Sequence, residues 1–144
     1  MEAGTRHRSG FTLLDALAGL GLAAVLGGIG VVRLVDLVQT ARLAGAARTV
    51  ATGLRLARGV AMSGDATIEV RFDAARAVCE TRDRAGVVLE THPLPPGVAF
   101  AALPARSRIA FGGLGTAENG TITLACGRRV RSVIVNQRGR VRVQ

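Results

Sequence analysis

Hydrophobic and polar positions divide the chain into a continuous apolar stretch followed by segments that alternate. Between Phe11 and Val32 nearly every residue is Leu, Ala, Gly, Val or Ile, and the only charged side chain in these 22 residues is Asp15. As an α-helix this stretch would be ~33 Å long, enough to cross a hydrocarbon core of about 30 Å. The pattern therefore predicts a membrane-spanning helix over residues 11–33.

The same helix is predicted to continue as an amphipathic segment over residues 34–63 and to end at Ser63-Gly64-Asp65. Apolar residues recur here at steps of three and four, which places them on one helix face. We therefore expect this half of the helix to lie on a globular domain. The apolar stripe consists of Leu43, Ala47, Val50, Leu54, Ala57 and Ala61.

The remaining residues predict short strands and an α+β fold, with an antiparallel sheet or small sandwich packed against the helix. In residues 66–73, for example, apolar and polar side chains alternate. The proline-rich cluster at residues 92–97 is expected to break the chain rather than extend a strand. The predicted strands cover residues 66–73, 77–82, 86–91, 98–102, 107–111, 121–125, 131–135 and 140–143, with a loop at 112–120.

The short polar segment before the apolar stretch indicates how the chain is processed. It contains Arg6 and Arg8 and ends in Ser9-Gly10, and no Ala-x-Ala-like signal-peptidase site follows the apolar stretch. Cleavage between Gly10 and Phe11 would leave the helix on the mature protein and create an α-amino group four residues before Asp15. Because a carboxylate inside a membrane helix is costly, Asp15 is expected to have a functional partner.

The string Gly10-Phe11-Thr12-Leu13-Leu14-Asp15 resembles the prepilin motif of type IV pilins and type II secretion pseudopilins. The resemblance implies that a prepilin peptidase cuts after Gly10 and that Phe11 is N-methylated. It also implies that Asp15 pairs with the amino terminus of a neighbouring subunit during filament assembly. The family usually has Glu at this position, so Asp15 keeps the charge on a shorter side chain. The alternative is a plain signal anchor in which Asp15 is incidental.

The C-terminal half is similar to the GspH/FimT group of minor pseudopilins in residues 121–124, 132–136 and 139–143. Both resemblances together imply a type IV pilin-like fold, with a leader at residues 1–10 and a β-rich periplasmic domain at residues 64–144. The arginines before the span favour a cytoplasmic N-terminus and a single pass through the inner membrane. The expected partners are the prepilin peptidase, the inner membrane and other pilin or pseudopilin subunits.

The two cysteines, Cys79 and Cys126, fit an oxidising compartment such as the periplasm, where a disulfide between them is plausible. The alternative is a pair of buried, unpaired thiols.

The net charge of +9 is concentrated near the C-terminus, since residues 105–144 contain eight Arg and one acid, Glu118. Such arginines could form a cationic ridge suited to nucleic-acid phosphates. FimT-type minor pilins are associated with DNA capture, and their Gly-Arg-x-Arg motif is matched by residues 139–142. The alternatives are a solvated face or a patch that meets an acidic neighbour at a filament tip. The arginines of the predicted ridge are Arg128, Arg129, Arg131, Arg138, Arg140 and Arg142.

No residue pattern indicates an enzyme. If the leader is removed, His92 is the only His, and no ligand or nucleophile lies beside it at metal-site or catalytic spacing. The glycines at residues 112–115 lack the Lys-Ser/Thr of a phosphate loop. We therefore expect no catalytic residue, metal or cofactor. The sequence predicts a minor pilin or pseudopilin, with DNA uptake as the alternative function, and leaves open whether secretion or pilus machinery uses it.

Overall fold

The computed structural model describes residues 12–144, apart from the side chains of residues 29–32. Gly10 and Phe11, the predicted cleavage site, lie outside this range. One helix, α1 (Leu13–Gly64), is followed by eight strands. The chain divides into two compact units, Met1–Leu37 and Val38–Gln144.

The first unit contains the apolar start of α1. Its large side chains face outward, with Leu13 81% and Leu20 73% exposed. The most apolar 18-residue window of the helix has a mean hydropathy of 2.0, and none of it is buried within the protein. By length and composition the helix can therefore cross a membrane, as predicted.

In the second unit, the rest of α1 contributes one face to the core. All six residues of the predicted apolar stripe are buried, and none is more than 4% exposed. Ala46 and Ala51 widen this buried face, and their small side chains allow the strands to pack closely. The helix ends at Gly64, where the backbone of Asp65 turns to a φ of 45°. The helical period predicted from the sequence is thus confirmed.

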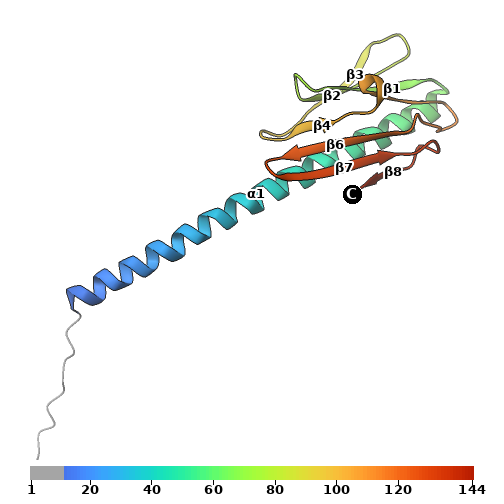
Figure 1. The fold of residues 1–144 in the computed structure, drawn as a ribbon. Helices are drawn as coiled ribbons and strands as arrows, with labels where there is room; N and C mark the ends of the chain where they lie inside the picture. Colours follow the sequence, from blue (N-terminus) through green and yellow to red (C-terminus); the bar gives the residue numbers. More distant parts are fainter. Residues whose placement is uncertain (1–11) are drawn as a thin grey trace, which may run out of the picture. The chain divides into compact units, whose positions relative to one another are not determined.

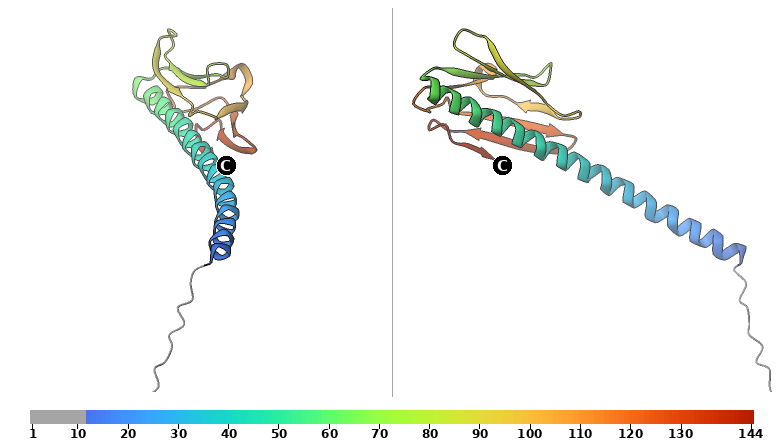
Figure 2. Two further views of the ribbon diagram at one scale, coloured as in Figure 1. Left: turned by 90° about the vertical axis from the view of Figure 1, so that its left-hand side faces the viewer. Right: turned by 180° about the vertical axis from the view of Figure 1, so that it is seen from behind.

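The strands form two antiparallel four-stranded sheets, ordered β3-β2-β1-β5 and β4-β6-β7-β8. Figures 1 and 2 show both sheets bordering the green half of α1. We call the first sheet A and the second sheet B. Sheet A comprises β1 (Ile68–Asp73), β2 (Val78–Arg82), β3 (Val88–Pro93) and β5 (Arg108–Phe111); sheet B comprises β4 (Ala99–Ala102), β6 (Gly120–Cys126), β7 (Arg129–Val135) and β8 (Val141–Val143); η1 (Ala105–Ser107) precedes β5.

The core lies between the inner faces of the two sheets and the buried face of α1. Ile109 and Phe111 of sheet A and Ile122 and Leu124 of sheet B are completely buried. On each of these strands the buried residues alternate with more exposed ones. This arrangement confirms the predicted α+β fold, and its strands form two sheets.

The predicted break at residues 92–97 begins too early, because β3 continues through His92 and Pro93 instead of ending at Thr91. The other strand ends differ from the predicted ones by at most two residues. His92 pairs with Cys79 and Pro93 pairs with Val78. β3 is an edge strand of sheet A and has a neighbour, β2, on one side only. A proline at its end therefore removes no hydrogen bond to a second neighbouring strand.

Candidate functional site

Asp15 lies in the first turn of α1, where it is hydrogen-bonded to Thr12. The Thr12 hydroxyl donates to Oδ2 of Asp15 at 2.8 Å, and the Thr12 N–H donates to the same oxygen at 3.2 Å. In return, the Asp15 N–H donates to the Thr12 hydroxyl oxygen at 3.2 Å. This reciprocal pattern is a capping box, in which the carboxylate satisfies a free backbone donor at the helix start. The side chain of Asp15 remains exposed, so its other oxygen is open to a partner.

The six arginines of the predicted ridge do not form a single ridge. Arg128 lies in the β6–β7 turn and Arg129 and Arg131 lie in the first half of β7, whereas Arg138 and Arg140 lie in the turn after its other end. The seven residues of β7 place the two turns ~20 Å apart. The prediction fails because successive hairpin turns lie at opposite ends of a sheet.

The strand register also places these arginines on different faces. Arg142 pairs with Ile134 and is exposed, while its neighbour Val141 pairs with Val135 and is buried. Arg131 instead pairs with the buried Leu124, and paired residues point to the same face. Arg142 and Arg131 therefore point to opposite sides of sheet B.

Two of the predicted arginines line a cavity with a residue of α1. This cavity of about 320 Å³ is lined by Arg58, Asn136, Arg138 and Arg140. Arg58 is half-buried, and its Nε donates to the carbonyl oxygen of Gly115 at 3.1 Å. Guanidinium and carboxamide groups supply many N–H donors, so the cavity has the chemistry of an oxyanion site.

A second depression of about 350 Å³ adjoins the first, because both are lined by Asn136 and Arg138. Asn119 and Gln137 complete its lining. Neither depression is lined by a carboxylate, and residues 119–144 contain no Asp or Glu at all. We call the two depressions together the arginine cavity.

Two glycines allow the β7–β8 turn to approach α1 at the arginine cavity. Gly139 has a φ of +67°, and a Cβ atom built on it would lie 2.6 Å from Nε of Arg58 and closer still to the Gly115 carbonyl oxygen. A Cβ atom on Gly115 would lie 2.8 Å from Sδ of Met62. The glycine of the Gly-Arg-x-Arg motif is therefore required by packing.

Hydrogen bonds within the turn hold the backbone of Gly139 and of the arginine that follows it. The Gly139 N–H donates to the carbonyl oxygen of Asn136 at 2.8 Å, and the Arg140 N–H donates to Oδ1 of Asn136 at 2.9 Å. On α1, Nη2 of Arg55 donates to the Val141 carbonyl oxygen at 3.4 Å, which ties β8 to the helix. The cavity wall thus consists of an ordered turn and a helix face.

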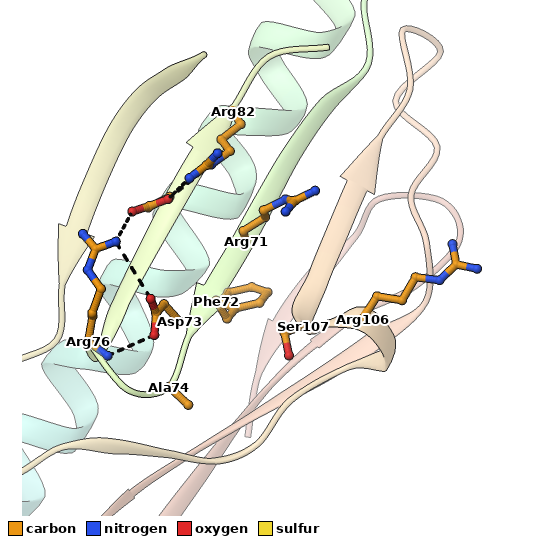
Figure 3. Close-up of a pocket in the computed structure, with 9 residues that line it drawn as sticks. Arg71, Phe72, Asp73, Ala74, Arg76, Arg82, Arg106 and Ser107 are labelled. Carbon is orange, nitrogen blue, oxygen red and sulfur yellow. Dashed lines mark hydrogen bonds and ion pairs between the residues drawn. The ribbon is translucent and has the colours of Figure 1, made fainter. Parts of the chain in front are cut away.

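The arginines of sheet A, by contrast, are paired with acids. The Glu80 carboxylate accepts hydrogen bonds from Nη2 of Arg82 at 2.6 Å and from Nη1 of Arg76 at 3.1 Å (Figure 3). The bond from Arg82 is the main reason that the pKa of Glu80 lies below its ordinary value. Glu69 likewise forms ion pairs with Arg71 and Arg108. The charges on this face neutralise one another, which is typical of a structural network.

The predicted disulfide between Cys79 and Cys126 is not formed. Both thiols are free and buried, and they lie in different sheets, on β2 and β6. Burial raises the pKa of Cys79 to about 12, so this thiol is protonated and unreactive at neutral pH. The structure therefore has the alternative arrangement, two unpaired thiols.

His92 is packed against α1 rather than exposed in a proline-rich turn. A Cβ atom on Gly53 would lie 3.4 Å from Cδ2 of His92, and Nε2 lies 3.2 Å from Oε1 of Glu90. Within residues 12–144 no three His, Cys, Asp or Glu side chains lie close enough together to hold a metal ion.

Comparison with known families matches residues 46–139 to the family described as type II transport protein GspH. The match covers 94 of 144 residues, from α1 to the glycine of the β7–β8 turn. The chain belongs to the GspH family.

Solved structures share the fold of this GspH-family chain. The type IV minor pilin FimU of Pseudomonas aeruginosa is 17% identical, with a TM-score of 0.62, over 75% of this chain and 92% of FimU. The minor pseudopilin EpsH of Vibrio cholerae is 14% identical, with a TM-score of 0.59, over 72% of this chain and 96% of EpsH. No curated protein matches the sequence. The fold is therefore that of type IV pilin-like proteins.

Four residues of the arginine cavity were not predicted as site residues from the sequence of this GspH-family protein. They are Arg58, Asn119, Asn136 and Gln137. Arg58 belongs to the polar side of α1, and no local pattern relates it to a carbonyl group 57 residues later. Asn119 and Gln137 lie in two loops joined by a hydrogen bond from the Ala117 N–H to the Gln137 carbonyl oxygen. Only the folded sheet brings these residues together.

Proposed function

We propose that this GspH-family protein is a minor pilin or pseudopilin that is processed and then assembled into a filament. In this proposal a prepilin peptidase cuts after Gly10, Phe11 is N-methylated, and residues 11–33 anchor the protein in the inner membrane with its β-domain in the periplasm. The observation that carries the proposal is the contrast within α1. Its apolar start has no buried window, whereas one face of its second half is buried in the protein's own core.

Asp15 has the geometry that an assembly contact needs. Both hydrogen bonds from Thr12 go to Oδ2, and within the described residues Oδ1 accepts none. The amino terminus of a neighbouring subunit can therefore bind Oδ1 while Thr12 keeps the carboxylate in place. Because this contact would form among apolar helices, a charge-assisted hydrogen bond would be strong there.

Mass spectrometry of protein purified from its native host tests the processing step. We expect a mature chain that starts at an N-methylated Phe11, and Gly10→Ala should cause the precursor to accumulate. A chain that keeps Met1, or that starts at any residue other than Phe11, would disprove processing by a prepilin peptidase. Filament assembly would then need a different explanation.

A second function, binding of nucleic acid, is supported by the arginine cavity and by the lack of acids in sheet B. Residues 119–144 carry six Arg without one Asp or Glu. Phosphate contacts of this kind give affinity without sequence readout, and the affinity falls steeply with salt. In FimT-like proteins this would serve DNA uptake.

Titration of the full-length protein in neutral detergent with labelled DNA of mixed sequence, at several salt concentrations, tests this second function. We expect binding that weakens with salt and weakens further when Arg140 and Arg142 are both replaced by Gln. Affinity that is independent of both salt and these arginines would exclude it.

A further inference from the structure

Arg58 has free donors at the wall of the arginine cavity. Its Nε is used by the Gly115 carbonyl, and within residues 12–144 neither Nη atom donates a hydrogen bond. The bond to Gly115 fixes the plane of the guanidinium group, so both Nη atoms are positioned before any ligand binds. Pre-positioned donors of this kind lower the entropy cost of binding.

The positive charge around Arg58 is not compensated by the protein. Arg58, Arg138 and Arg140 line one cavity that no carboxylate lines. On sheet A, by comparison, Arg76 and Arg82 share Glu80, and Arg71 and Arg108 share Glu69. Three guanidinium groups around one cavity repel one another unless an anion lies between them. The arginine cavity therefore brings together three arginines that lack an acidic partner among its lining residues.

The shape of the arginine cavity indicates a ligand with more than one anionic group. Its two depressions share Asn136 and Arg138, and both are lined only by donor-rich polar side chains. A single carboxylate has about four acceptor sites, fewer than the N–H groups of three guanidinium groups. A nucleic-acid strand repeats its phosphates at short intervals and supplies acceptors to both depressions.

We propose that Arg58 is a phosphate-binding residue and that the arginine cavity holds consecutive phosphates of a nucleic-acid strand. This inference rests on the nucleic-acid binding proposed above and adds a helix residue to it. The strand would lie along the β7–β8 turn, with Arg58 and Arg140 at one phosphate and Asn136 and Arg138 between that phosphate and the next. Phe111 is buried and Phe100 packs against Phe72 in the core, so the contact is with the backbone and not with stacked bases.

The test compares Arg58→Gln with Arg84→Gln in full-length protein in neutral detergent. Arg84 is an exposed residue of the β2–β3 turn, so both variants lose one positive charge. Loss of one phosphate contact should weaken DNA binding roughly five- to tenfold near 0.1 M salt. It should also reduce the slope of log affinity against log salt by about 0.7 for single-stranded or about 0.9 for double-stranded DNA. Arg84→Gln should change affinity less than about twofold and leave the slope unchanged.

Each outcome bears on the proposal. If wild-type protein does not bind DNA, nucleic-acid binding itself is excluded. If wild-type protein binds and the two variants weaken binding equally, nucleic-acid binding stands and the role of Arg58 is overturned. If polyglutamate binds more tightly than DNA and depends on Arg58, the cavity takes an acidic polypeptide. Should Arg58→Gln not fold, Arg58→Met keeps an unbranched side chain without the charge, and binding equal to that of wild type would overturn the proposal.

Discussion

Replacing Gly139 with Ala should destabilise the β-domain more than replacing any glycine whose surroundings are open. Gly139 has a φ of +67°, and a left-handed backbone costs a residue with a Cβ about 1–2 kcal/mol. The new Cβ would also lie 2.6 Å from Nε of Arg58, so the hydrogen bond from Arg58 to Gly115 must break or shift. Losing a hydrogen bond that involves a charged group costs roughly 1.5–3 kcal/mol. The expected loss is therefore about 2.5–5 kcal/mol, a large fraction of the stability of a typical domain.

Gly86→Ala is the matched control for the conformational part of this effect. Gly86 has a φ of +86°, and nothing lies within 4 Å of a Cβ atom built on it. This variant should lose only about 1–2 kcal/mol, and the lower entropy of its unfolded chain should offset part of that loss. The difference between the two variants, about 1.5–3 kcal/mol, measures the packing of Gly139 against Arg58 and Gly115.

The assay is denaturant unfolding of the full-length protein in detergent, followed by circular dichroism and amide hydrogen exchange. The chain has no Trp or Tyr, so intrinsic fluorescence gives little signal. The hydrogen-exchange rates of the β6 and β7 amides report unfolding of the sheets even if α1 stays helical in the micelle. If Gly139→Ala is no less stable than Gly86→Ala, the close approach at the arginine cavity does not contribute to stability and the packing argument is refuted.

Three further predictions concern charged and thiol groups. Asp15→Asn protein should still insert into the membrane, as measured by membrane fractionation. It should fail to enter filaments, as measured by the yield of sheared filaments, and a normal yield would exclude the assembly contact. Because the pKa of Glu80 is lowered by folding, its contribution to stability should be complete at neutral pH and lost as pH falls below about 4.5 through the folded-state value. In Glu80→Gln protein the unfolding midpoint should therefore decrease less as the pH falls below about 4.5. A decrease as large as in wild type would contradict this. Since burial raises the pKa of Cys79 to about 12, maleimide should label it at pH 8 only after unfolding, and rapid labelling of native protein would contradict the burial.

The helix and most strands could be predicted because their signals are local. The six residues of the apolar stripe recur at helical period, and all are buried where that period places them. The alternation in residues 68–73 likewise places Val70 and Phe72 in the core. The error at His92 and Pro93 arose because a proline-rich cluster normally breaks a strand, whereas an edge strand tolerates a terminal proline.

The division into two sheets and the arginine cavity could not be predicted, because both depend on long-range pairing. β5 pairs with β1 of sheet A, although β4 before it and β6 after it belong to sheet B. No alternation pattern encodes that choice of neighbour. In the same way, Arg58 reaches Gly115 and the β7–β8 turn only after the sheets close around α1. The separation of the six arginines, by contrast, could have been predicted, because the turns before and after one predicted strand must lie at its opposite ends.

The residues of the Gly-Arg-x-Arg motif have different roles, which follow from these contacts. Gly139 leaves room for the Arg58 side chain, and the turn that it permits directs Arg140 to the same cavity. Arg142, by contrast, is exposed on the outer side of β8 opposite Ile134. A substitution at Gly139 should therefore lower both stability and anion binding, whereas Arg140→Gln should lower anion binding alone. Because Arg140 lines the arginine cavity and Arg142 is not among its lining residues, their effects on binding should add when both are replaced. Strong non-additivity would instead mean that both arginines contact the same phosphate.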